Sequence, residues 1–303
     1  MTAIETTKLT KRYGEETALD EFTLRVERGE VFGFLGPNGA GKSTTIDIFL
    51  DFIRPTDGHA VVADYDPQQT PRKVRQNIGV LPDEYSLYDS LTGIEHIELA
   101  KDLHGSEEDT DALLSRVGLT DAGDQAVGSY SKGMAQRLAF GMALVGDPDV
   151  LILDEPSAGI DPNGLQDMRE MIRAEAEAGT TIFFSTHILE QVEAVCDRVA
   201  IINDGELVAV DTIAGLRDVF DRQSTLTLSI DGTPTALELG DLNGVSDVEY
   251  TDGTLTVKLR DPQLKSTVIA QVEASGVSVT NIEIEEASLA DLFSQLTTGG
   301  DSE

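Results

Sequence analysis

The chain has 303 residues, enough for one large domain or two smaller ones, and its single cysteine, Cys196, excludes an internal disulfide. No apolar run approaches the roughly 20 residues that span a bilayer, and the N-terminus lacks the apolar core of a secretory signal, so we expect an intracellular protein. The 55 acidic and 22 basic side chains give a formal net charge of −33, which argues against general binding to nucleic acid.

Strand and helix signals alternate along residues 1–220. FTLRV at 22–26 alternates apolar and polar residues, as a half-exposed strand does. Short apolar runs of the kind that form buried parallel strands occur at 31–35, 150–153, 181–185 and 199–202. The pattern predicts an α/β fold, in which a mixed sheet with covering helices carries a helical subdomain at about 90–145.

The residue pattern changes after about residue 222. Alternating apolar and polar residues predict strands at 224–230, 254–259 and 277–284. The stretch 262–276, which begins at a proline and ends at a glycine, predicts a helix. Ser288 precedes Asp291 by three residues, which resembles a capping box at the start of a last helix. We therefore expect a small α+β domain over residues 223–298.

A glycine-rich segment, GPNGAGKST, follows the first apolar run and fits the pattern G-x-x-x-x-G-K-[ST]. Its glycines let successive N–H groups point inward, and the start of the next helix adds positive potential, which together suit phosphate oxygens. Lys42 can reach the β- and γ-phosphates, while Ser43 offers a hydroxyl to Mg²⁺. A chance turn fits poorly between a strand and a helix. The expected nucleotide contacts are Gly36, Pro37, Asn38, Gly39, Ala40, Gly41, Lys42, Ser43 and Thr44.

Two acids end the apolar run at 150–153, in VLILDEPSAGID. An acid at the carboxyl end of a parallel strand lies beside a phosphate loop. Asp154 is therefore expected to hold Mg²⁺, directly or through water, and Glu155 to act as general base on the attacking water. Taken alone, the pair could equally be solvated acids at a strand end, and the glycine-rich loop favours the functional interpretation.

Two further features have weaker local support. In YSKGM, Ser131 and Gly133 precede a helix-like run and predict a helix start that attracts an anion, with an ordinary N-capped helix as the alternative. His187 follows the run at 181–185, where its side chain could reach a γ-phosphate. A lone histidine at a strand end is more often structural.

In this order the motifs resemble the nucleotide-binding subunit of ATP-binding-cassette (ABC) transporters, a P-loop NTPase cassette, over roughly residues 1–220. The resemblance identifies 36–44 as the Walker A loop and 150–155 as Walker B with the catalytic glutamate. It identifies His187 as the switch histidine, a catalytic residue, and 157–161 as the D-loop, whose last residue, Asp161, is expected to contact the nucleotide. ATP and Mg²⁺ are the implied ligands.

The same resemblance implies a role for one aromatic residue and for the YSKGM segment. Tyr13 would stack on adenine, although a strand-end tyrosine packed on the sheet is the alternative. The segment stands where the family has its LSGGQ signature. Lys132 and Met134 replace a glycine and the glutamine there, whereas Ser131 and Gly133 are kept. We expect these four residues to contact the nucleotide.

A second departure concerns the Q-loop. Asp83 follows Pro82 where the family has a glutamine. Its carboxylate can still offer oxygen to Mg²⁺ or orient water, so we expect Asp83 to be both a metal ligand and a catalytic group. It also adds negative charge beside a triphosphate. An ordinary turn acid is the alternative, and Glu84 is the replacement if the register slips by one residue.

The resemblance also implies partners. Two subunits pair head to tail around ATP, and a homodimer would have two complete sites. A separate integral membrane permease would contact the surface near residues 83–100, which places the chain on the inner face of the cell membrane. SKGM and the C-terminal SLADLFSQLT are similar to exporter subunits, many of which handle drugs, antibiotics or other amphipathic compounds.

Two other functions remain open from the sequence, a soluble ABC ATPase acting on ribosomes or nucleic acid and a non-hydrolysing regulatory module. The acidity and the single cassette argue against the first, and Glu155 and His187 against the second. The acidity has a further implication. Surface charges of one sign repel each other less where the Debye length is short, ~3 Å at 1 M salt. The charge therefore predicts a protein adapted to a salt-rich cytosol.

Overall fold

The computed structural model describes residues 1–157, 159–220, 224–232, 239, 242, 244–251, 253–259 and 264–286. The chain forms two compact units, Met1–Asp211 and Thr212–Glu303. The boundary predicted from the sequence, at about residue 220, lies at the end of helix α8, Ile213–Phe220, and therefore inside the second unit. No helix in the described ranges is long and apolar enough to cross a membrane.

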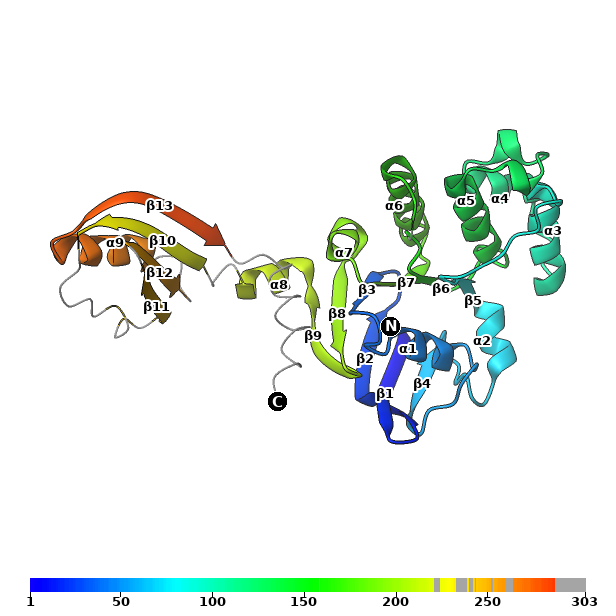
Figure 1. Cartoon of the computed structure of the whole chain (residues 1–303). Coiled ribbons are helices and arrows are strands. Elements are labelled where there is room, and N and C mark those ends of the chain that lie inside the picture. Colours follow the sequence, from blue (N-terminus) through cyan, green and yellow to red (C-terminus); the bar gives the residue numbers. More distant parts are fainter. Residues whose placement is uncertain are drawn as a thin grey trace. The chain divides into compact units, whose positions relative to one another are not determined.

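A six-stranded sheet is the centre of the first unit, with the strand order β5-β6-β7-β3-β8-β9 (Figure 1). Strands β5, β6, β7, β3 and β8 pair in parallel with their neighbours in this order. The strands are β3 Val31–Leu35, β5 Ile78–Leu81, β6 Val150–Asp154, β7 Thr181–Thr186, β8 Arg198–Asn203 and β9 Glu206–Thr212. Each of the four apolar runs in the sequence is a strand of this sheet. Every residue of β3 and β7 is buried, which is why neither strand alternates.

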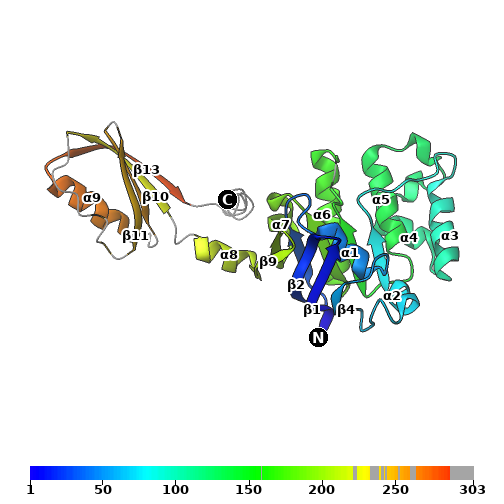
Figure 2. The ribbon, with the colours of Figure 1, turned by 60° about the horizontal axis from the view of Figure 1, so that its bottom comes forward.

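A second, antiparallel sheet has the order β2-β1-β4, and Figure 2 shows its three strands side by side. Its members are β1 Thr2–Tyr13, β2 Glu16–Glu27 and β4 Asp57–Val62. Side chains of both sheets share one apolar core. Within it the Phe183 ring lies 5.2 Å from that of Phe34 and 5.6 Å, edge to face, from that of Phe49. Because Phe49 belongs to α1, these contacts fix that helix, and the loop before it, against the sheet.

The helices of the first unit lie against the two sheets, except α3 and α4, which pack with α5 in a helical group beside the six-stranded sheet (Figure 1). They are α1 Lys42–Phe49, α2 Pro71–Asn77, α3 Gly93–His104, α4 Thr110–Arg116, α5 Lys132–Ala143, α6 Pro162–Glu177 and α7 Leu189–Val195. Helix α3 begins with a capping box between Thr92 and Glu95. Helix α5 approaches β5 so closely that a Cβ at Gly79 would lie 1.9 Å from the Ala143 carbonyl oxygen. The predicted mixed sheet with covering helices is confirmed.

The second unit contains an antiparallel sheet of order β11-β12-β10-β13 and the helices α8 and α9. The elements not yet given are β10 Ser224–Asp231, β11 Val245–Thr251, β12 Thr254–Leu259, α9 Lys265–Ala274 and β13 Ser278–Glu286. Leucines of β10 and β12 form its core with Val268 and Val272 of α9. The predicted small α+β domain is confirmed, whereas the helix expected from Ser288 lies outside the described residues.

Candidate functional site

Strand β3 leads directly into the glycine-rich loop, which main-chain hydrogen bonds anchor on both sides. Gly36 donates its N–H to the Thr186 carbonyl at 3.2 Å, and Gly205 donates to the Ala40 carbonyl at 3.1 Å. A Cβ at Gly36 would lie 2.5 Å from the Ile202 carbonyl oxygen. Only glycine therefore lets the loop pack this tightly against β8.

Gly41 turns the loop into helix α1 with a left-handed backbone, φ 105°. A Cβ there would lie 2.7 Å from the Ala18 carbonyl oxygen, so the position needs glycine for both conformation and space. Among the described residues no side chain caps α1, and its first turn contains no acid. The first N–H groups of the helix are thus open to an external anion, which suits phosphate.

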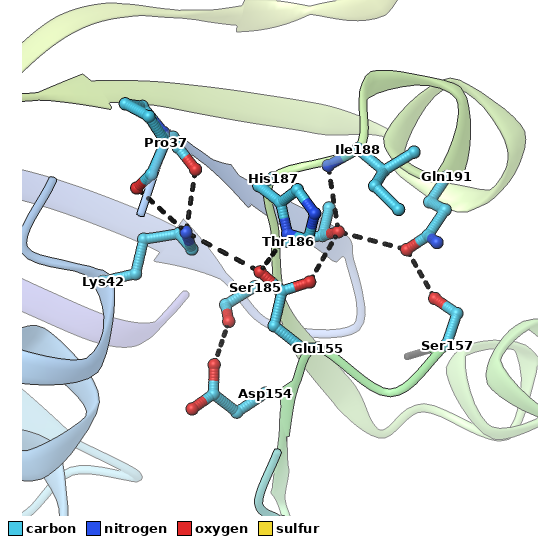
Figure 3. Close-up of polar contacts among 11 residues, drawn as sticks. Pro37, Lys42, Asp154, Glu155, Ser157, Ser185, Thr186, His187, Ile188 and Gln191 are labelled. Carbon is cyan, nitrogen blue, oxygen red and sulfur yellow. Dashed lines mark hydrogen bonds and ion pairs between the residues drawn. The ribbon is translucent and has the colours of Figure 1, made fainter. Parts of the chain in front are cut away.

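Lys42 is largely buried, and its ammonium group is held by the loop itself (Figure 3). The Nζ atom donates to the carbonyl oxygens of Gly36 at 2.7 Å and Pro37 at 3.2 Å. It also lies 3.6 Å from Oε1 of Glu155. Burial lowers the pKa of Lys42, and nearby carboxylates, Glu155 foremost, oppose that effect. This cation is therefore desolvated and ready to accept an anionic partner.

Glu155 follows β6 with a left-handed backbone, φ 46°, which is uncommon outside glycine. Its N–H donates to the Ser185 carbonyl at 3.0 Å. Oε1 lies 2.9 Å from Nδ1 of His187, and Oε2 accepts from the Thr186 hydroxyl at 3.1 Å. Both carboxylate oxygens are therefore held, as Figure 3 shows.

Asp154 precedes Glu155 and accepts a hydrogen bond from the Ser185 hydroxyl. Burial raises the pKa of Asp154, and the neighbouring charges of Asp83 and Glu155 act in the same direction. Asp83 lies in the loop after β5. The Ser185 hydrogen bond and the Lys42 charge oppose this shift, and a cation bound beside the three carboxylates would oppose it further.

One cavity of about 260 Å³ brings these groups together. Its lining consists of Asn38, Gly39, Gly41, Lys42, Ser43, Thr44, Asp83, Asp154 and Glu155. The hydroxyl of Ser43 and the carboxylates of Asp83 and Asp154 form an oxygen donor set of the kind that Mg²⁺ takes. Together with the open start of α1, the cavity fits a magnesium-bound phosphate chain. Glu84, the replacement for Asp83, is not among the lining residues.

Three other predicted groups lie outside this lining. The Tyr13 ring at the end of β1 is half exposed, and Nζ of Lys11 lies 4.9 Å from its centre. Ser131 caps α5, where its hydroxyl accepts from Met134 N–H at 3.2 Å. Asp161 caps α6, where it accepts from Gly164 N–H.

The signature segment instead lies against the D-loop of the same chain. A Cβ at Gly159 would lie 2.0 Å from Nζ of Lys132, and one at Gly133 would lie 3.9 Å from the Ile160 side chain. Gly159 has φ 68°, so a side chain there would be strained. The predicted signature and D-loop residues thus contact each other and are separate from the residues that line the nucleotide cavity.

Sequence reasoning missed Ser185, Thr186 and Gln191. The Thr186 hydroxyl lies 3.1 Å from both Glu155 Oε2 and Gln191 Oε1, and Ser157 also donates to Gln191 Oε1. The signal was present in TIFFST, because Ser185 and Thr186 are polar residues in a completely buried strand. Buried hydroxyls need partners, and these contact Asp154 and Glu155.

Comparison with known proteins agrees with this geometry. Residues 19–158 match a family model described as ABC transporter, and residues 212–297 match the C-terminal domain of DrrA1-3-like ATP-binding proteins. The chain is 34% identical over 305 residues to the daunorubicin resistance ATP-binding protein DrrA2 of Streptomyces coeruleorubidus, a match that covers 97% of this chain and 95% of that protein. It is 33% identical over 301 residues to the bacitracin transport ATP-binding protein BcrA of Enterococcus faecalis, covering 98% and 97% respectively.

Solved structures are similar over the first unit. An ATP-binding subunit of an ABC transporter superimposes with a TM-score of 0.64 at 30% identity, covering 72% of this chain and 92% of that one. The match in sequence extends over nearly the whole chain, and the match in structure includes the sheet that carries the site. The chain therefore belongs to the family of ABC transporter ATP-binding subunits, which are ATPases.

Proposed function

We propose that this ATPase powers the export of drug-like or amphipathic compounds through a separate membrane permease. The observation that supports the ATPase activity is one cavity in which the glycine-rich loop, Lys42, Asp154 and Glu155 meet. The names of the relatives, bacitracin transport and daunorubicin resistance, support the class of cargo. Their matches cover nearly all of this chain, and therefore the C-terminal domain as well as the cassette.

The geometry supports a direct route for hydrolysis. When ATP binds, Lys42 exchanges its bonds to loop carbonyls for the β- and γ-phosphates. Glu155 then accepts a proton from the attacking water, while His187 and Thr186 hold its carboxylate in place. Ser43, Asp154 and Asp83 would hold Mg²⁺, which when bound neutralises charge on the phosphates. The other contributions of these residues to hydrolysis are to position the reactants and to stabilise the charge that develops on the phosphates.

We infer that the active form is a homodimer in which the site is completed from the second subunit. Ser131, Lys132, Gly133 and Met134 lie outside the lining of their own chain's cavity. Head-to-tail pairing would place the partner's segment at the start of α5 against the γ-phosphate. Asp161 would lie at the same interface, and Tyr13 would stack on adenine.

A second cavity supports a docking site for the permease on this chain. This docking groove, about 720 Å³, lies among α2, α3, α5 and the loop after β5, and its lining includes Phe52, Leu81, Tyr85, Leu99, Leu103 and Met142. Phe52 and Leu103 are 69% and 80% exposed, which is uncommon for such large apolar side chains. Arg72 and Arg75 add positive charge at its rim in an otherwise acidic protein. Docking here would place the chain at the inner face of the membrane.

The experiment uses the full chain in molar KCl, together with the polytopic protein of about six apolar spans expected from a neighbouring gene. We expect micromolar to millimolar ATP affinity, phosphate release that requires Mg²⁺, and higher turnover in the presence of the permease. Transport of a fluorescent amphipathic drug into inverted vesicles would establish the cargo class. If the purified chain neither bound ATP nor released phosphate, the proposal that it is the ATPase of an exporter would be wrong.

A further inference from the structure

Tyr85 belongs to the loop after β5, which contributes residues to both the docking groove and the nucleotide cavity. It belongs to the lining of the groove, and it follows Asp83, which lines the cavity, by two residues. Its hydroxyl donates to Oε1 of Gln136 at 2.5 Å. Gln136 belongs to α5, the helix that Ser131 caps. One tyrosine thus connects the loop after β5 with the signature helix.

Gln136 continues the connection on its other side. Its Nε2 donates to the Pro156 carbonyl oxygen at 2.7 Å, and the residue is only 5% exposed. A single amide therefore satisfies both partners, and it can do so in only one orientation. If Tyr85 moved away, the buried Oε1 of Gln136 would lose its donor, which is unfavourable. The position of Tyr85 and the contact to Pro156 are therefore coupled.

Pro156 directly follows Glu155, whose left-handed backbone needs support from its surroundings. Gln136 holds the Pro156 carbonyl, and on the other side Ser157 donates to Gln191. The backbone that aims the Glu155 carboxylate is thus fixed from two directions. On the Gln136 side the connection reaches the docking groove through Tyr85.

We propose that Tyr85 and Gln136 are positioning residues that transmit the state of the docking groove to Glu155, an inference that rests on the proposed function. An occupant of the groove that moves Tyr85 loosens or tightens the bond from Gln136 to Pro156. The Glu155 carboxylate changes its aim, while the main-chain hydrogen bonds that anchor the phosphate loop at Gly36 and Ala40 do not involve Gln136. Occupancy of the groove therefore alters turnover and leaves the affinity for ATP largely unchanged.

Steady-state kinetics of the purified full chain provide the first test. Gln136→Glu keeps an acceptor for Tyr85 but cannot donate to Pro156, and we expect kcat to fall about tenfold or more with KM within about twofold. Tyr85→Phe removes one oxygen atom, and we expect kcat to fall about threefold to tenfold. In the double variant the losses should not add, because both act through one contact. Unchanged kcat in either single variant, or a loss that appears only in KM, would overturn the inference.

A matched control separates positioning from general damage. Gln68 also donates its Nε2 to a main-chain carbonyl, that of Ile48, at 3.0 Å. Gln68→Ala should leave kcat unchanged, although it also removes a side-chain hydrogen bond to the main chain. If the two variants lowered kcat equally, the effect would be structural and the inference wrong.

A fluorescence measurement tests the reverse direction, because coupling between two sites is reciprocal. The native Cys196 is buried, so a bimane label attaches selectively at Ser86→Cys, in the docking groove beside Tyr85. Mg–ATP should shift the bimane emission, and Gln136→Glu should abolish that shift while ATP still binds. If the shift persisted in the Gln136→Glu variant, the inference would be wrong but the proposed function would stand. If the unmodified chain did not bind ATP, the proposed function itself would be wrong.

Discussion

The Nζ atom of Lys42 lies 3.6 Å from Oε1 of Glu155, and the two side chains are only 7% and 13% exposed. The loop's cation and the proposed general base therefore hold each other in a desolvated pair. In the proposed mechanism a γ-phosphate entering the cavity would compete for Lys42 and leave Glu155 free to accept a proton. The pair would then link the readiness of the base to the arrival of the substrate. Removing either partner leaves a buried charge, which is unfavourable.

Lys42→Ala should weaken ATP affinity about tenfold or more, because a charge-assisted hydrogen bond to phosphate is lost. Titration with a fluorescent ATP analogue measures the change. Lys258→Ala is the matched control, because its ammonium pairs with Asp247 on an exposed sheet of the second unit. Equal affinities for the Lys42 variant and the unmodified chain would remove Lys42 from the phosphate site.

Glu155→Gln should lower kcat by about 10²–10⁴ and leave ATP binding intact, because the amide keeps the shape of the side chain but cannot accept a proton. Phosphate release and nucleotide titration measure the two effects separately. Bound ATP should also hold the dimer closed, which size-exclusion chromatography detects. Glu249→Gln, on exposed strand β11, is the control. Normal turnover in the Glu155 variant would assign the base elsewhere.

The cavity-lining groups were predictable because their signals are local. The spacing of GPNGAGKST is continuous in sequence, and acids that end a parallel strand reach the same edge as the loop after β3. Asp83 was placed at the site by resemblance and lines the cavity. The fold class followed from apolar runs whose residues proved to be buried throughout.

Other features depend on tertiary contacts that one sequence does not display. Gln136 is one of several polar residues in its helix, and only the fold shows that its amide lies between Tyr85 and Pro156. The positive φ of Glu155 has no sequence signal, since it arises from packing around the strand end. Strand β11 was missed because exposed acidic residues obscure its alternation, leaving only Val245 and Val248 half-buried.

Asp154→Asn should raise the melting temperature of the nucleotide-free protein at pH 7. Burial raises the pKa of Asp154, so the folded protein binds this proton more tightly than the unfolded chain does. The associated stability is fully present below the unfolded pKa of about 3.9 and is lost as the pH rises through the folded value. At pH 7 the native carboxylate therefore destabilises the fold, and asparagine does not.

Thermal melts of both proteins between pH 4 and pH 7 measure this difference, which should shrink as the pH falls. The variant should also lose about 10- to 100-fold in Mg²⁺-dependent turnover, because the amide lacks the charge that favours the metal. A lower melting temperature for the variant at pH 7 would show that the buried Asp154 carboxylate does not destabilise the fold.

Stability should rise steeply with KCl concentration, because 55 acidic side chains face only 22 basic ones. Repulsion among the acids is screened as the Debye length falls from ~10 Å at 0.1 M to ~3 Å at 1 M salt. Neutralising three exposed acids in the triple variant Glu107→Gln, Asp121→Asn, Asp124→Asn should let the protein reach the same melting temperature at lower KCl. Melting curves in KCl, with isosmotic sucrose as control, distinguish screening from preferential exclusion. A melting temperature independent of KCl would contradict adaptation to a salt-rich cytosol, because repulsion would then contribute nothing measurable to the fold.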